Sequence, residues 1–195
     1  MFINWKLREI NLKIVYYGPP LSGKTTNLEY IHSKLKPELR SELISLKTRE
    51  DRTIFFDFLQ LEIGEIKRLK PKFNLYTVPG QTIYTSSRKL VLQGVDGLVF
   101  VASSEWDQLQ ENEKSMQNLK ENLHSLGYDL KKIPLLIQYN KRDLPDRVPI
   151  NILAARLGSN GFAHIESVAT HGIGVFETLK MIINTVVTRV QREVG

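Results

Sequence analysis

The sequence of 195 residues contains no cysteine. This excludes disulfide bonds, thiolate metal sites, cysteine nucleophiles and the attachment of prenyl or palmitoyl groups. A long apolar run is also missing, because the most apolar stretch, Leu98 to Ala102, is far shorter than the about 20 residues that cross a bilayer. Residues 1–6 show neither an apolar export signal nor a Met-Gly start for myristoylation. We therefore expect a cytoplasmic protein with no integral membrane segment.

Histidines in metal-binding patterns and clustered charges of one sign are absent as well. The four histidines show no mutual metal-ligand spacing, and no GxSxG motif marks a serine hydrolase. The net charge is +6, but lysine and arginine are scattered among acidic residues. Because nucleic acid is bound by clustered cations, we expect no nucleic-acid partner.

Strand-length and helix-length segments alternate along the chain, as in an α/β fold. The expected strands are Ile10 to Tyr17, Ile54 to Ile63, Phe73 to Val78, Gly97 to Ala102, Ile133 to Tyr139 and Ile165 to Ala169. The expected helices are Lys24 to Leu35, Thr82 to Leu92, Leu109 to Leu126 and Val175 to Val190. The second and third strands are separated by too few residues for a crossover helix, so they should form an antiparallel hairpin. The pattern predicts a six-stranded, mostly parallel sheet with helices on both faces.

A phosphate-binding motif follows the first expected strand directly. Residues 18–25 read GPPLSGKT, which matches GxxxxGK[ST] in the strand-loop-helix context that the motif requires. The loop amides and the helix N-terminus would surround phosphate oxygens, Lys24 would reach the β- and γ-phosphates, and Thr25 would ligate magnesium. The nucleotide-contacting positions of this segment are Gly18, Leu21, Ser22, Gly23, Lys24, Thr25 and Thr26. The motif predicts a P-loop NTPase, and the length of the chain, with no linker or repeat to divide it, predicts that residues 1–195 form one domain. Pro20 is unusual because it removes an N–H and stiffens the loop.

A base-recognition motif stands at the end of the fifth expected strand. Residues 140–143 read NKRD, an NKxD pattern, where an open α/β sheet presents its ligand crevice. Asp143 can accept hydrogen bonds from the ring N1–H and the exocyclic amine of guanine, a donor pattern that adenine lacks. Asn140 would brace neighbouring loops, and the Lys141 stem would cover one face of the base. In isolation the same residues could form a polar turn, but their place after a P-loop favours a guanine site.

A second loop, which follows the last expected strand, is a weaker candidate for the base site. Residues 167–170 read SVAT, and the backbone N–H of Ala169 could bond the guanine O6. Thr170 completes this predicted contact.

The segment Thr77-Val78-Pro79-Gly80-Gln81 resembles the DxxGQ segment of GTPases. Thr77 replaces the acid that normally holds magnesium through water, so this side of the metal site should be altered. The N–H of Gly80 would contact the γ-phosphate. Gln81 would orient the attacking water, unless it is merely an exposed loop amide.

A charged run before the hairpin carries the remaining candidates. We expect Thr53 to be the second magnesium ligand, which would sense the γ-phosphate through the metal. Arg52 could act as an arginine supplied in cis, with Arg49 as its rival and a solvated arginine as the plain alternative.

Together these segments resemble the MglA family, the bacterial Ras-like small GTPases of cell polarity and gliding or twitching motility. The resemblance spans nearly the whole chain and is carried by EINLKIVYYGPPLSGKTTNL, DRTIFFDFLQLEIGEIK, LYTVPGQTIY, SRKLVLQGVDG, NKRDLP and VATHGIGVFETLK. It implies that a threonine at position 77 is normal, that Arg52 is the intrinsic arginine finger and that Gln81 is the catalytic glutamine. Pro20 departs from the family, in which many members have glycine.

The resemblance also implies partners. The family's activator is MglB, a roadblock-fold homodimer that stimulates slow GTP hydrolysis without donating its own finger, and polarity or motility effectors remain unidentified. It further implies a monomer by itself, recruitment to a cell pole, and sliding of the hairpin, Ile54 to Val78, between GTP and GDP states. Two alternatives stay open: a GTP-binding scaffold whose hydrolysis is degraded by Pro20 and Thr77, and a P-loop kinase, for which NKRD and VPGQ would have no use.

Overall fold

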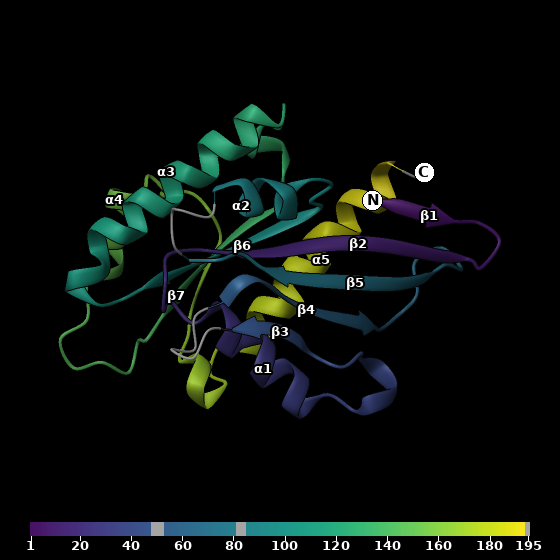
Figure 1. The fold of residues 1–195 in the computed structure, drawn as a ribbon, viewed down its shortest axis with the longest axis horizontal. Coiled ribbons are helices and arrows are strands. Elements are labelled where there is room, and N and C mark those ends of the chain that lie inside the picture. Colours follow the sequence, from purple (N-terminus) through teal and green to yellow (C-terminus); the bar gives the residue numbers. More distant parts are fainter. Residues whose placement is uncertain (48–52, 81–84, 194–195) are drawn as a thin grey trace.

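The computed structural model describes residues 1–47, 53–80 and 85–193 (Figure 1). Its strands are β1 (Phe2–Asn4), β2 (Glu9–Tyr17), β3 (Ile44–Lys47), β4 (Thr53–Glu62), β5 (Lys70–Thr77), β6 (Gly97–Ser103), β7 (Leu135–Asn140) and β8 (His164–Glu166). Its α-helices are α1 (Lys24–Lys34), α2 (Thr85–Leu92), α3 (Leu109–Ser125), α4 (Ile150–Leu157) and α5 (Val175–Glu193).

The strands form one mixed sheet in the order β3-β4-β5-β2-β6-β7-β8, and β1 pairs with β2 off this path. β2 is parallel to β5 and β6, and the parallel pairing continues through β7 to β8. β4 is antiparallel to β5, which confirms the predicted hairpin. The described sheet exceeds the predicted one by two short antiparallel strands, β1 and β3, whose three and four residues give no clear alternation.

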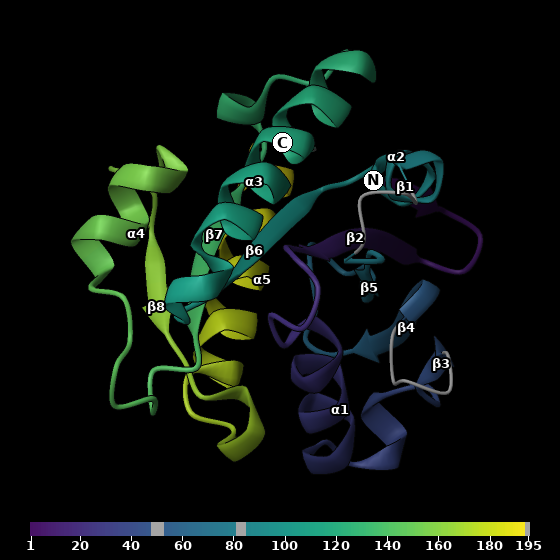
Figure 2. The ribbon, with the colours of Figure 1, turned by 60° about the vertical axis from the view of Figure 1, so that its left-hand side comes forward.

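Helices cover both faces of the sheet, as the fold prediction required (Figure 2). Along β2, Ile14 and Tyr16 pack into a core that includes residues of α1 and α5. The alternate residues, Val15 and Tyr17, pack into a second core with residues of α2, α3 and α4. β6 is buried along its whole length, as expected for a strand covered on both faces. The result is a three-layer α/β architecture, to which α4 adds an eight-residue helix that the sequence pattern did not indicate.

Parallel pairing places the carboxyl ends of β2, β5, β6, β7 and β8 at one edge of the sheet. The loops that begin at residues 18, 78, 104, 141 and 167 therefore leave the sheet at this edge, where α/β proteins bind their ligands. In the part of the chain described here, no helix combines the length and apolar character that a bilayer crossing requires.

Candidate nucleotide site

The loop between β2 and α1 is built around two glycines in conformations that other residues avoid. Gly18 has φ 147° and Gly23 has φ 101°. A Cβ atom on Gly18 would lie 2.2 Å from the Val101 carbonyl oxygen, and one on Gly23 would lie 2.1 Å from Asn140 Nδ2. Glycine is therefore required at both positions for the loop to pack against β6 and β7.

Lys24 opens α1 and is buried beneath this loop. Its Nζ donates hydrogen bonds to the carbonyl oxygens of Gly18, at 3.1 Å, and Pro19, at 2.6 Å. Burial and, to a smaller extent, the nearby positive charge of Arg88 lower the pKa of Lys24, Asp57 partly offsets them, and the resulting pKa is about 7. The ammonium is thus held inside the loop in surroundings that would favour an added negative charge.

The same loop contains the buried side-chain hydroxyl of Ser22. Its side-chain oxygen is buried and has no hydrogen-bond partner among the described residues. A buried hydroxyl without a partner is costly, which fits a loop that receives an anionic ligand.

A cavity of about 210 Å³ joins the loop to the base motif. Its lining residues are Leu21, Gly23, Thr26, Asn140, Lys141, Asp143, Leu144, Val168, Ala169 and Thr170. Residues predicted from three separate sequence segments thus lie around one space.

Asn140 connects these three segments through its side chain. Its Nδ2 donates to the Ser22 carbonyl oxygen at 2.8 Å, and its Oδ1 accepts from Ser167 Oγ at 3.0 Å and from the Ala169 N–H at 2.9 Å. The sequence predicts a hydrogen bond from the Ala169 N–H to guanine O6. In the structure this N–H donates to Asn140 instead. Ala169 remains a lining residue of the cavity.

Lys141 is held in place by an acid that sequence reasoning missed. Its Nζ forms an ion pair with Glu105, which also accepts from Ser103 Oγ at 2.7 Å. Burial raises the pKa of Glu105, but the hydrogen bonds from Lys141 and Ser103 outweigh it, so this pKa lies below its ordinary value. Lys141 itself has φ 64°, a strained conformation at the mouth of the base cavity.

Asp57 is the most important residue that the sequence analysis overlooked. It lies on β4, is fully buried, and its Oδ2 accepts from Thr25 Oγ1 at 2.5 Å and from Thr77 Oγ1 at 2.7 Å. Ser45 Oγ donates to the other carboxylate oxygen, Oδ1. The neighbouring strand β4 therefore places a carboxylate against the hydroxyl at position 77. The available signal was a carboxylate enclosed by phenylalanines, in the segment FFDF of residues 55–58.

Arg88 on α2 is a second residue that sequence reasoning missed. Its fully buried guanidinium donates from Nε to the Pro79 carbonyl at 2.8 Å, from a terminal nitrogen to the Gly80 carbonyl, and to Asn118 Oδ1 at 2.7 Å. It also lies over the ring of Tyr17, 5.3 Å from the centroid. No described carboxylate pairs with it. Its contacts fix the backbone that follows β5.

The structure does not describe the side chains of four candidate site residues. Arg52, its rival Arg49 and Gln81 lie outside the described residues, and Thr53 is described only as the first residue of β4. The structure gives no placement for these side chains.

Comparison with known proteins agrees with this geometry. Residues 1–186 match the ADP-ribosylation factor family. The chain is 53% identical over 191 residues to the mutual gliding-motility protein MglA of Myxococcus xanthus (strain DK1622), and the match covers 98% of each chain. The chain therefore belongs to the MglA family of Ras-like small GTPases, enzymes that bind and hydrolyse GTP.

Proposed function

We propose that residues 1–195 form a single GTP-driven switch domain that controls cell polarity and motility, with recruitment to a cell pole. The observation that carries the nucleotide assignment is the cavity shared by the P-loop, the NKRD segment and residues 168–170. The name of the 53% identical relative, a gliding-motility protein, supports the cellular role. Identity this high over the full length makes a shared role the simplest reading.

In this proposal Asp143 selects guanine, because its carboxylate matches two donors of the base. Asn140 holds the loops around the base, and the Lys141 stem packs against one face of it, positioned by Glu105. Lys24 and the amides of residues 18–26 hold the phosphates. A carboxylate left without its donors costs about 1–3 kcal/mol, which disfavours ATP.

The proposal includes magnesium at the phosphate end of the site. The Thr25 hydroxyl, the Asp57 carboxylate and the Thr77 hydroxyl converge in the structure, and such an all-oxygen donor set suits this hard cation. Thr25 and Thr53 would ligate it. Asp57 would contact it through water, in place of the aspartate that other GTPases have at the position of Thr77. When bound, magnesium neutralises charge on the β- and γ-phosphates.

Hydrolysis is assigned to three groups. The Gly80 N–H would contact the γ-phosphate, Gln81 would orient the attacking water, and Arg52 would stabilise the charge that develops on the transferred phosphoryl group. Intrinsic turnover would be slow, and an MglB-like roadblock homodimer would accelerate it. The β4–β5 hairpin would slide between nucleotide states and present different surfaces to effectors.

The test is a binding and hydrolysis assay of GTP against ATP, with and without the roadblock activator. We expect GTP to be preferred strongly and activated turnover to rise by orders of magnitude. Arg52→Ala and Gln81→Ala should each remove most of the activated rate, whereas Arg49→Ala, the matched control in the same charged run, should keep it. Turnover that stays flat with the activator would favour the scaffold alternative, and loss in Arg49→Ala alone would move the finger to that residue.

A further inference from the structure

We propose that the end of the molecule opposite the nucleotide site docks on an anionic lipid bilayer. The surface consists of the turn between β1 and β2, residues 5–8, and the turn between β4 and β5, residues 64–70, together with Phe2. We call it the basal turn surface. It combines exposed apolar side chains with cations, the composition that binds the boundary between water and an acidic membrane.

The apolar part comes from one short stretch of chain. Phe2 is 65% exposed, Trp5 70% and Leu7 57%. Met1, next to Phe2, is 45% exposed, and the other large exposed apolar side chains of the described residues are more widely separated along the chain. Exposed single apolar residues are ordinary, but three within six residues on one hairpin need an explanation. Tryptophan is moreover the side chain most characteristic of membrane interfaces.

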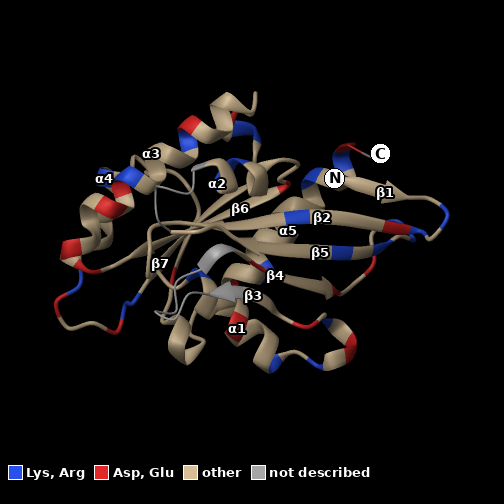
Figure 3. Ribbon diagram, in the orientation of Figure 1, with Lys and Arg blue, Asp and Glu red and all other residues tan. Residues whose placement is uncertain are grey.

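The cationic part is strongly biased in sign. The two turns contain Lys6, Arg8, Lys67, Arg68 and Lys70, all exposed, against one carboxylate, Glu65. Figure 3 shows the basic segments at the tip of the β1–β2 turn and near the start of β5. Other nearby acids are engaged, because Glu9 and Glu62 both pair with Lys72.

The backbone of these cations is strained. Five described residues other than glycine have a positive φ, and three of them are Arg8 at 54°, Lys67 at 47° and Arg68 at 65°. Glycine or asparagine would adopt this conformation with less steric cost. Long cationic side chains at three such positions indicate that their charge is useful there.

The two turns form one surface rather than two. The Lys70 N–H donates to the Arg8 carbonyl oxygen at 2.7 Å, where β2 and β5 begin side by side. Lys67 Nζ reaches the Gln191 carbonyl of α5 at 3.3 Å. β2 then runs nine residues, about 30 Å, before the phosphate loop. A bilayer on this surface would leave the nucleotide site open.

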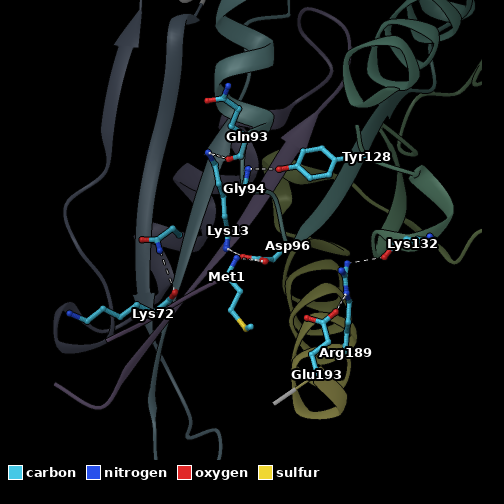
Figure 4. A network of polar contacts seen from close by, with 11 residues as sticks. Met1, Lys13, Lys72, Gln93, Gly94, Asp96, Tyr128, Lys132, Arg189 and Glu193 are labelled. Carbon is cyan, nitrogen blue, oxygen red and sulfur yellow. Dashed lines mark hydrogen bonds and ion pairs between the residues drawn. The ribbon is translucent and has the colours of Figure 1, made fainter. Parts of the chain in front are cut away.

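The hairpin that carries Trp5 is fixed to the body of the protein. The Met1 ammonium pairs with Asp96 at 2.7 Å, and the same carboxylate accepts from the Lys13 N–H at 2.8 Å (Figure 4). Lys13 Nζ in turn donates to the Gln93 carbonyl at 3.0 Å. A held hairpin can present Trp5 and Leu7 without losing much conformational freedom on binding.

Lipid fits this surface better than other polyanions. Nucleic acid and acidic proteins would pair with the cations, but neither by itself offers an apolar region that buries Leu7 and Phe2 at the same place. An acidic bilayer offers phosphate and carboxylate groups directly above an apolar interior, so it satisfies both halves of the surface. The chain has no cysteine for lipid attachment, so such docking would be weak and reversible.

The test uses the full chain loaded with GDP and two kinds of vesicle, phosphatidylcholine with phosphatidylserine and phosphatidylcholine alone. We expect sedimentation with the first kind only, weakened by added salt. Lys67→Gln with Arg68→Gln should lower the affinity by roughly 20-fold, since each cation near an acidic surface contributes about fivefold. Lys114→Gln with Lys120→Gln on α3, an equal loss of charge elsewhere, should leave it within twofold.

Tryptophan fluorescence tests the orientation independently. Trp106→Phe leaves Trp5 as the single indole, and its emission should move to shorter wavelength on binding acidic vesicles. Trp5→Phe leaves Trp106 as the control, and its emission should not move although the protein still binds. Retained GDP affinity shows that each variant is folded. Absence of binding to acidic vesicles, equal effects of the two lysine-containing pairs, or equal binding to soluble polyglutamate would each overturn the proposal.

Discussion

Gly80, after β5, lies directly against Pro20 of the phosphate loop. A Cβ atom on Gly80 would stand 2.4 Å from the Pro20 Cα and 2.5 Å from its nitrogen. The second proline of the phosphate loop therefore touches the residue to which we assign the γ-phosphate contact. Its ring fixes the loop backbone on one side of this contact, and Arg88 holds the Gly80 carbonyl on the other.

The first prediction concerns this contact. Gly80→Ala should slow GTP hydrolysis by about 100-fold, because the added methyl group must displace the Pro20 backbone and misplace the γ-phosphate contact. GDP affinity should change much less, since GDP lacks that phosphate. Single-turnover hydrolysis and GDP titration measure the two effects. Gly127→Ala, after α3, is the control: its φ of 76° makes alanine cost some stability, but its Cβ would meet nothing within 4 Å and lies outside the site and the hairpin, so turnover should stay normal.

The second prediction concerns Arg88. Arg88→Met should lower the free energy of unfolding by about 3 kcal/mol, because it leaves the Pro79 and Gly80 carbonyls and Asn118 without their donor. Hydrolysis should also slow, since the backbone after β5 is no longer held. Urea unfolding and single-turnover assays measure both, and Lys89→Met on the same helix should change neither. A fully stable, fully active Arg88→Met protein would contradict this assignment.

Much of the fold was predictable because its signals are local. The alternation of apolar strands and helical segments along the chain determined the parallel sheet and the β4–β5 hairpin. β1 and β3 were not predictable, since strands this short owe their existence to a pairing partner rather than to their own pattern. α4 was missed because it is short. Its eight residues place only two side chains in the core, Leu153 and Leu157, which is too few to show a helical period.

The site divides in the same way. The P-loop and NKRD residues stand in fixed spacings, so their meeting around one cavity could be expected. Asp57 and Arg88 carry no motif, and their contacts with Thr25, Thr77 and Asn118 join residues 20 to 32 positions apart. Only the folded arrangement shows that a carboxylate on β4 faces Thr25. The threonine at position 77 was visible in the sequence, but the carboxylate that accepts its hydrogen bond was not.

The third prediction concerns that carboxylate. Asp57→Asn should weaken magnesium-dependent nucleotide retention by about 10- to 100-fold, the usual effect of losing an outer contact of a metal site. The measurement is the dissociation rate of labelled GDP in magnesium and in chelator. The variant and the parent should differ in magnesium and converge in chelator, because only the metal contact is lost.

Thr77→Ser provides the matched control for Asp57. It keeps the hydroxyl that donates to Asp57 Oδ2 and accepts from the Asp57 N–H at 2.9 Å, so magnesium dependence should remain. If Asp57→Asn loses nucleotide equally in magnesium and in chelator, the carboxylate supports the fold and has no part in holding the metal.

The last prediction concerns the charge of Lys24. Its pKa in the nucleotide-free fold is about 7, below the ordinary value of 10.5 that the unfolded chain retains. Between these pH values the unfolded chain binds more protons, so the stability of the free protein should rise with pH through this window. Below about pH 7 both forms hold the proton, and the cost of burying the cation is fully present.

Bound phosphate should reverse this preference, because its negative charge favours the protonated lysine. At about pH 8.5, GDP binding should therefore take up close to one proton per site, measured by titration calorimetry in buffers of different ionisation enthalpy. Lys24→Arg keeps a permanent positive charge, so any GDP that it binds should bring no uptake at this position. Arg88→Met should also reduce the uptake, since removal of the neighbouring cation raises the Lys24 pKa in the free protein. Equal uptake in Lys24→Arg and the parent would assign the proton to another group.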